Sequence, residues 1–234
     1  MKKVETWFID IGNSSLQYIK QTQLKTGVVQ ELKAIECTAD TLKDLFFGQK
    51  LYICSVVPNI DKLLTQIADC CFVDASLITD FKIAIDQPTQ LGADRCVNAY
   101  AAYKLYGGPV LVIDSGTAIT CCVVDSNGNY LGGTIVPGMG IASKALNDYT
   151  AKVPLIWVKP QHAILGKSTK QAVEVGLYHG YIHMINGMIN QLKQAYDIKY
   201  IVGTGQGVAV LKDKLTIDCY DEKLVFKGLS LIVE

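Results

Sequence analysis

The chain has 234 residues, of which 50% are hydrophobic and 19% are charged, a balance that is typical of a compact globular protein and excludes a disordered one. Basic and acidic residues number 22 each, so the chain lacks the basic excess of a nucleic-acid-binding protein. It contains no apolar run of about 18 residues, the length of a membrane span. The start MKKVETWFIDIGN does not resemble a signal peptide, because Asp10 interrupts its apolar residues. We therefore expect a cytoplasmic protein that binds neither nucleic acid nor membrane.

The spacing of the cysteines favours reduced thiols over disulfides or a metal site. Eight cysteines occur, four of them in two adjacent pairs, and no C-x-x-C motif is present. Most lie in apolar runs such as LYICSVV, where a thiol behaves as a small buried hydrophobe. His179 and His183 lie one helical turn apart and could form a ligand pair, but no third ligand accompanies them. We favour a structural role for both histidines.

Two stretches of the chain resemble each other, WFIDIGNSS at 7–15 and LVIDSGTAI at 111–119. Each is an apolar run that ends in aspartate, followed by one residue and a glycine, and each continues into β-prone sequence. This pattern predicts a strand, a tight turn and a second strand, that is, a β-hairpin. The second hairpin continues through the turn signal Asn127-Gly128 into a third strand.

Asp10 and Asp114 lie about half a chain apart, which indicates a duplication of two α/β halves. We expect the halves to span residues 1–106 and 107–234, with a cleft between them. The other predicted elements are, in chain order, a helix over 38–46, a strand over 50–57, helices over 59–70, 140–150 and 169–196, and a strand over 199–205.

An aspartate at a strand end beside a glycine turn is suited to phosphate chemistry. The carboxylate can hold a cation or orient a water, and the glycine lets backbone N–H groups approach a phosphate. Two such loops could clamp the phosphates of ATP. The alternative for each loop alone is an ordinary hairpin turn.

The segment HAILGKST at 162–169 ends like a P-loop, but the remainder of that motif is missing. A P-loop has a glycine five positions before the Gly-Lys pair, and here that position is Gln161. We therefore expect the nucleotide phosphates to bind elsewhere.

Asp94, in LGADRCVNAYAAY, precedes a helix-like segment. One interpretation is a capping aspartate at the start of that helix. The other is catalytic, because Gly92 and Arg95 beside it would form a compact site in which Asp94 accepts the proton of an attacking hydroxyl.

Six motifs in this order resemble the type III pantothenate kinases. They are DIGNSS at 10–15, GADR at 92–95, DSGTAIT at 114–120, GGTIVPG at 132–138, TAKVP at 150–154 and LVFKGL at 224–229. The resemblance implies a duplicated actin-like (ribonuclease H-like) α/β fold and a homodimer. It also implies ATP-dependent phosphorylation of pantothenate to 4'-phosphopantothenate, the first step of coenzyme A biosynthesis, with Mg²⁺ and a monovalent cation (K⁺ or NH₄⁺).

The resemblance also implies a role for individual residues. Asp94 would be the catalytic proton acceptor, Asp10 would lie near the magnesium, and Asp114 would coordinate the monovalent cation. The residues expected to bind ATP are Asp10, Ile11, Gly12, Asn13, Ser14, Ser15, Leu16, Gln17 and Thr117. Those expected to bind pantothenate are Gly92, Ala93, Asp94, Arg95 and Thr169, together with the position of Ile85.

Two departures and two alternatives remain. Ser14 replaces the usual threonine, and Ile85 stands where the family has a tyrosine that contacts pantothenate. The turn GTGQG at 203–207 could approach the adenosine. The alternative functions are a non-catalytic regulator on the same fold and a kinase for another small hydroxyl compound.

Overall fold

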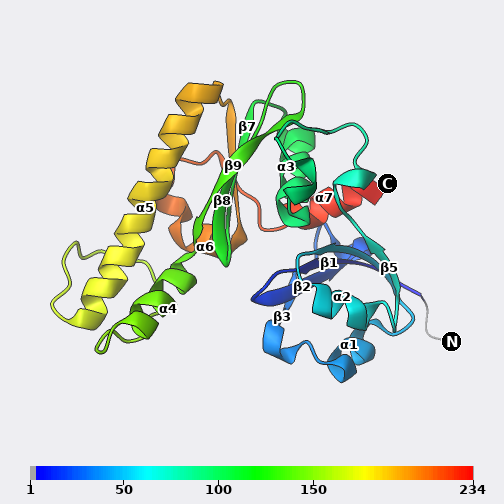
Figure 1. The fold of residues 1–234 in the computed structure, drawn as a ribbon, viewed down its shortest axis with the longest axis horizontal. Coiled ribbons are helices and arrows are strands. Elements are labelled where there is room, and N and C mark those ends of the chain that lie inside the picture. Colours follow the sequence, from blue (N-terminus) through cyan, green and yellow to red (C-terminus); the bar gives the residue numbers. More distant parts are fainter. Residues whose placement is uncertain (1–3, 234) are drawn as a thin grey trace. The chain divides into compact units, whose positions relative to one another are not determined.

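The computed structural model describes residues 4–233, which divide into two compact units (Figure 1). The first unit runs to Leu105 and resumes at Lys223, and the second spans Tyr106–Glu222. The expected division at 106/107 assigned residues 223–234 to the second half, whereas the structure groups them with the first unit. In the described part of the chain, no helix combines the length and hydropathy that crossing a membrane requires.

The first unit is built on a five-stranded sheet of order β3-β2-β1-β4-β5. β1 and β2 form the predicted hairpin, and β4 and β5 continue the sheet in parallel on the other side of β1. The strands of this sheet are β1 (Thr6–Ile11), β2 (Ser15–Lys20), β3 (Gln30–Lys33), β4 (Lys50–Ser55) and β5 (Asp69–Phe72), and a short strand β6 (Lys82–Ile83) is not part of it. The helices are α1 (Ala39–Phe46), α2 (Pro58–Leu64), α3 (Ala93–Tyr106) and α7 (Leu224–Val233).

Alternation along β1 directs its side chains to two different cores. Ile9 and Ile11 pack in one cluster with the buried residues of α1 and α2. Phe8 packs on the other face with Val97 of α3 and Phe226 of α7. Figure 1 shows α1 and α2 on one side of this sheet and α3 and α7 on the other. Asp10 follows Phe8 by two residues, so its side chain belongs to the α3 and α7 face.

The second unit repeats this arrangement strand for strand. Its strands lie in the order β9-β8-β7-β10-β11, with an antiparallel hairpin β7–β8 and parallel strands β10 and β11 beyond β7. The match with the first sheet confirms the predicted duplication. The strands are β7 (Val110–Ser115), β8 (Ala118–Val124), β9 (Asn129–Pro137), β10 (Tyr200–Thr204) and β11 (Cys219–Tyr220). The helices are α4 (Met139–Tyr149), α5 (Thr169–Tyr196) and α6 (Gly205–Leu211).

One predicted helix is too long. The helix expected over 59–70 ends at Leu64, and Asp69–Phe72 forms β5 instead. The N–H of Asp69 donates to the carbonyl of Gln49 at 2.9 Å and starts the pairing of β5 with β4. Backbone pairing with a neighbouring strand therefore overrides the local helical pattern.

Candidate active site

The first hairpin turn presents polar residues at the end of β1. Asp10, half-buried, pairs with Gln17 across the hairpin, and the N–H of Gly12 donates to the carbonyl of Ser15 at 3.0 Å. The carbonyl of Ser14 accepts the N–H of Ala34 at 2.9 Å, which ties the turn to the end of β3. Asn13 and Ser14 are exposed. The turn is thus fixed by backbone bonds while its polar side chains face solvent.

Asp94 lies in the first turn of α3, and a glycine gives it room. The carbonyl of Gly92 accepts the N–H of Cys96 at 3.1 Å, so the helix begins at Ala93 and Asp94 is its second residue. A Cβ added to Gly92 would lie 2.6 Å from Asp94 Oδ1, so the carboxylate folds back over Gly92. Arg95 donates from Nη2 to the carbonyl of Gln90 at 3.4 Å. Its guanidinium is therefore directed toward the segment that precedes Gly92.

The fold brings Asp10 and Asp94 to one face of the first sheet. Asp10 shares its face of β1 with Phe8, and Ala93, next to Asp94, packs against the cluster that contains Phe8. Ile85 lies half-buried in a bend between β6 and the 3-10 turn Pro88–Gln90, seven residues before Gly92. Its apolar side chain supplies no hydrogen bond there.

The second hairpin turn is held by backbone hydrogen bonds and packs against Gly138, where there is no room for a side chain. The N–H of Gly116 donates to the carbonyl of Ala118 at 2.9 Å, and that of Gly138 to Thr117 at 3.0 Å. A Cβ on Gly138 would lie 2.4 Å from the carbonyl oxygen of Gly116. Asp114 pairs with Thr120 on β8 and with Thr204 on β10. Its half-buried carboxylate is therefore fixed at the end of β7, between two strands.

Asp114 also affects a neighbouring tyrosine. Burial raises the pKa of the Tyr220 hydroxyl, and the negative charges of Glu222, Asp114 and Asp221 raise it further. The Asp114 carboxylate therefore lies close enough to the Tyr220 hydroxyl for its charge to act there.

The GKST segment caps a helix. Thr169 is the first residue of α5, and Ser168 Oγ accepts the N–H of Gln171 at 3.2 Å. Residues 150–168 before it are irregular, so no strand leads into this turn as it would in a P-loop. Thr169 is exposed at the helix start, open to a ligand.

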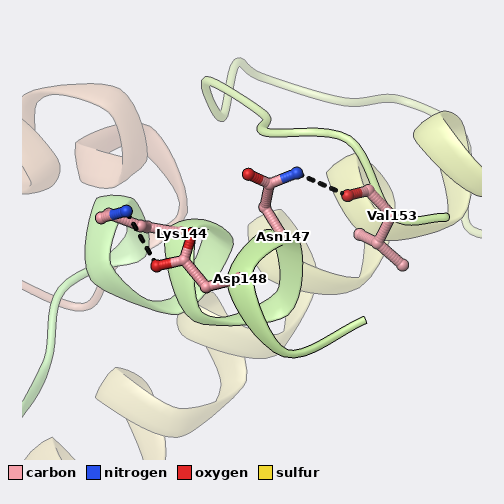
Figure 2. Close-up of polar contacts among 4 residues, drawn as sticks. All are labelled: Lys144, Asn147, Asp148 and Val153. Atoms are coloured by element: carbon pink, nitrogen blue, oxygen red, sulfur yellow. Dashed lines mark hydrogen bonds and ion pairs between the residues drawn. The ribbon is translucent and has the colours of Figure 1, made fainter. Parts of the chain in front are cut away.

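Polar contacts fasten the irregular segment to α4 and α5. Asn147 Nδ2 donates to the carbonyl of Val153 at 2.8 Å, one turn from the Lys144–Asp148 ion pair (Figure 2). The N–H of Ile156 donates to the buried Ser143 Oγ at 2.8 Å. His179 Nε2 lies 2.9 Å from the carbonyl oxygen of Ala163. The last contact supports the structural role expected of His179.

Residues 7–191 match the model of the family described as type III pantothenate kinase. A type III pantothenate kinase of Agathobacter rectalis is 43% identical over 189 residues, which cover 77% of this chain and 73% of that protein. This chain belongs to the type III pantothenate kinase family.

Solved structures show the same fold at low identity. A conserved Campylobacter jejuni protein assigned to a Baf family of transcriptional activators is 23% identical, with a TM-score of 0.65 and coverage of 97% of this chain and 96% of its own. MreB 5 of Spiroplasma citri, bound to AMPPNP, is 9% identical, with a TM-score of 0.52 and coverage of 99% and 96%. These similarities place this pantothenate kinase among the duplicated actin-like folds.

Two carboxylates at strand ends suit the cations that the resemblance implies. Mg²⁺ is usually held by one or two carboxylates together with phosphate oxygens and water, and Asp10 at a strand end offers one such carboxylate. A monovalent cation is coordinated by oxygen atoms. A Cβ added to Gly205 would lie 2.6 Å from Asp114 Oδ1 and 2.6 Å from the carbonyl oxygen of Ser115. These two oxygen atoms therefore lie near each other, where they could coordinate such a cation.

Proposed function

We propose that this chain phosphorylates pantothenate with ATP through Asp94, and that it does so in the cytoplasm. Membership of the family gives the reaction class: it is a kinase of the coenzyme A pathway. The observation that carries the residue assignment is the placement of Asp10 and Asp94 on one face of the first sheet, with the Asp94 carboxylate over Gly92.

Each polar element has one part in the proposed reaction. Asp94 accepts the proton of the primary hydroxyl of pantothenate as the hydroxyl oxygen bonds to the γ-phosphorus, and ADP leaves when the bridging bond breaks. Residues Asp10 to Gln17 hold the phosphates, and Gly92 to Arg95 and Thr169 hold pantothenate. Thr117 contacts ATP. Mg²⁺ at Asp10 and a monovalent cation at Asp114 would offset the phosphate charge.

The position of Ile85 changes the substrate contact without changing the chemistry. An isoleucine cannot replace the hydrogen bond of a tyrosine hydroxyl, so pantothenate loses about 1 kcal/mol of binding there unless another donor serves it. The loss would raise the KM for pantothenate and leave the proton transfer at Asp94 intact.

We expect ADP release from Mg·ATP to depend on pantothenate and to be severalfold faster in potassium than in sodium buffer. Sodium is smaller and holds its hydration shell more tightly, so it is a poor substitute at a site shaped for K⁺ or NH₄⁺. A coupled ADP assay with and without pantothenate, in each salt at equal ionic strength, measures both effects.

Each contrary outcome of this assay has a distinct meaning. Equal rates in the two salts would contradict the role given to Asp114. Turnover with another small alcohol but not with pantothenate would favour the other-substrate alternative. Folded protein that releases no ADP with any substrate would favour the regulator.

The same proposal includes a homodimer formed through α4 and α5. A groove of about 590 Å³ lies between these helices. Its floor contains Gly176 and Gly180, where an added Cβ would meet nothing within 4 Å. An exposed helical glycine costs about 1 kcal/mol relative to alanine, which a closely packed second copy would offset. The large apolar residues exposed on this part of the unit are Ile141, Leu146, Tyr149, Leu155, Trp157, Ile164 and Leu165.

Gly180→Lys is expected to convert the dimer to a monomer. Lysine favours the helix by about 0.5–1 kcal/mol over glycine, so α5 itself should be no less stable, whereas the long charged side chain would occupy the groove. Sedimentation velocity of the wild type and the variant measures the change.

Asp44→Lys, at an exposed site on α1, is the matched control and should remain dimeric. A monomeric wild type would contradict the homodimer, and a dimeric Gly180→Lys would exclude this groove as the interface.

A further inference from the structure

Ser115 is a buried polar residue at the end of β7 whose role the reaction so far leaves open. It shares a face of the strand with Leu111 and Ile113, which pack in the core of the second unit. Its exposure is 1%, and within residues 4–233 its Oγ has no hydrogen-bond partner. A buried hydroxyl without a partner destabilises a fold. The position therefore calls for a reason other than stability.

The first turn of α6 rests directly on Ser115. β10 runs parallel to β7 and ends with Thr204 opposite Asp114, so α6 starts beside the Asp114–Thr117 turn. A Cβ on Gly207 would lie 2.1 Å from Ser115 Oγ and 2.9 Å from Ser115 Cβ. These distances are shorter than any real Cβ contact, so Ser115 fits only because residue 207 is glycine.

Gly205, in the same helical turn as Gly207, contacts the Asp114 carboxylate. Gly205 has a φ of +82°, a conformation that favours glycine, and its added Cβ would lie 2.6 Å from Asp114 Oδ1. The start of α6 is thus in contact with Ser115 through Gly207 and with the Asp114 carboxylate through Gly205. A change in the first contact alters the second, because both glycines belong to the same turn of backbone.

We propose that Ser115 is a positioning residue for ATP: its side chain, seated against Gly207, sets how closely α6 approaches the Asp114–Thr117 turn. The inference rests on the proposed function, in which Asp114 and Thr117 act on the nucleotide side of the reaction. Ser115 itself contacts neither substrate. It sets the distance between α6 and the Asp114–Thr117 turn, and this distance in turn sets the position of the Asp114 carboxylate.

The test is a pair of compensating substitutions followed by direct binding of Mg·ADP. Gly207→Ala should weaken Mg·ADP binding about tenfold or more, since the new methyl group displaces the turn. Ser115→Gly combined with Gly207→Ala removes the two side-chain atoms that the methyl group would meet and leaves the carbonyl oxygen of Ser115 at 2.9 Å, so the double variant should recover most of the lost affinity. Ser115→Ala with Gly207→Ala retains the Cβ and should restore less. Isothermal titration calorimetry in potassium buffer gives each affinity.

Gly140→Ala is the matched control. Gly140 is also in the first turn of a helix, is exposed, and an added Cβ there meets nothing within 4 Å. It should bind Mg·ADP like the wild type. A thermal melt of each variant shows whether it is folded, and a merely structural contact would lower the melting temperature without changing the affinity for Mg·ADP.

Two outcomes would overturn the proposal: Gly207→Ala with wild-type affinity for Mg·ADP, or a double variant that binds no better than Gly207→Ala alone. Pantothenate is absent from the measurement, so the substrate is tested separately. A wild type that binds Mg·ADP but does not phosphorylate pantothenate would remove the substrate assignment and leave the pairing of Ser115 with Gly207 intact.

Discussion

Asp94→Asn is expected to lower kcat by about 10³-fold while the protein stays folded. Asparagine has the shape of aspartate and fits above Gly92, where the structure leaves space for the carboxylate. It cannot accept the hydroxyl proton, so the transition state loses its base while the bound substrates keep their places. We therefore expect the KM values for ATP and pantothenate to change much less than kcat in steady-state kinetics.

Asp40→Asn is a matched control for this substitution. α1 begins with Ala39-Asp40 as α3 begins with Ala93-Asp94, so both aspartates are the second residue of a helix. Each substitution to asparagine removes the same favourable interaction of a negative charge with a helix N-terminus. Asp40→Asn should retain full turnover. If Asp94→Asn also turned over at the wild-type rate, the cap interpretation of Asp94 would be correct and the catalytic one wrong.

Phe226→Ala is expected to destabilise the first unit by about 3–5 kcal/mol, the range for truncating a buried aromatic residue. Phe226 lies on α7, is 0% exposed and packs with Phe8 and Val97. The small side chain would leave a cavity against β1. Urea denaturation followed by the fluorescence of Trp7, on β1, should show the midpoint for this unit at a lower urea concentration.

Phe47→Ala is the corresponding control, because Phe47 is 62% exposed in the same unit. Its removal should cost less than about 0.5 kcal/mol. Equal losses from the two substitutions would show that α7 does not contribute to the core of the first unit.

The two hairpins could be predicted from the sequence because the signals for a hairpin are local. An apolar run and a glycine turn lie within nine residues at both 7–15 and 111–119, and a β-prone run follows each directly, so strand pairing is expected from that spacing. The helix over 169–196 was also predicted with its observed bounds. Its periodic apolar residues extend over many turns, where a helical pattern is least ambiguous.

Elements that depend on distant partners could not be predicted in this way. The segment 65–70 resembles the end of a helix in sequence, but Asp69–Phe72 pairs with β4 as a strand. Likewise, no pattern in LVFKGLSLIV predicts that α7 packs in the first unit. That placement depends on Gly228, where a Cβ would lie 2.6 Å from Val97 Cγ1. Only the folded chain brings these residues together.

The candidate site shows the same limit. Asp10, Asp94 and Asp114 stand out in the sequence because each lies beside a glycine at the end or start of an element. The pairing of Ser115 with Gly207 does not, since 92 positions separate the two residues. The glycine-rich GTGQG was the only signal, and a serine in the middle of DSGT has no distinguishing feature of its own.

The C-terminal residues from Lys223 onward belong to the first unit, and this affects the order in which the two units fold during synthesis on the ribosome. Tyr106–Glu222 is one uninterrupted stretch, so the second unit can fold as soon as it emerges from the exit tunnel. The first unit, although synthesised earlier, must wait for Val225, Phe226 and Leu229 to complete its core. Until then α3 alone covers this apolar face of β1 and β4, and in this interval the nascent protein is most exposed to aggregation and most dependent on chaperones.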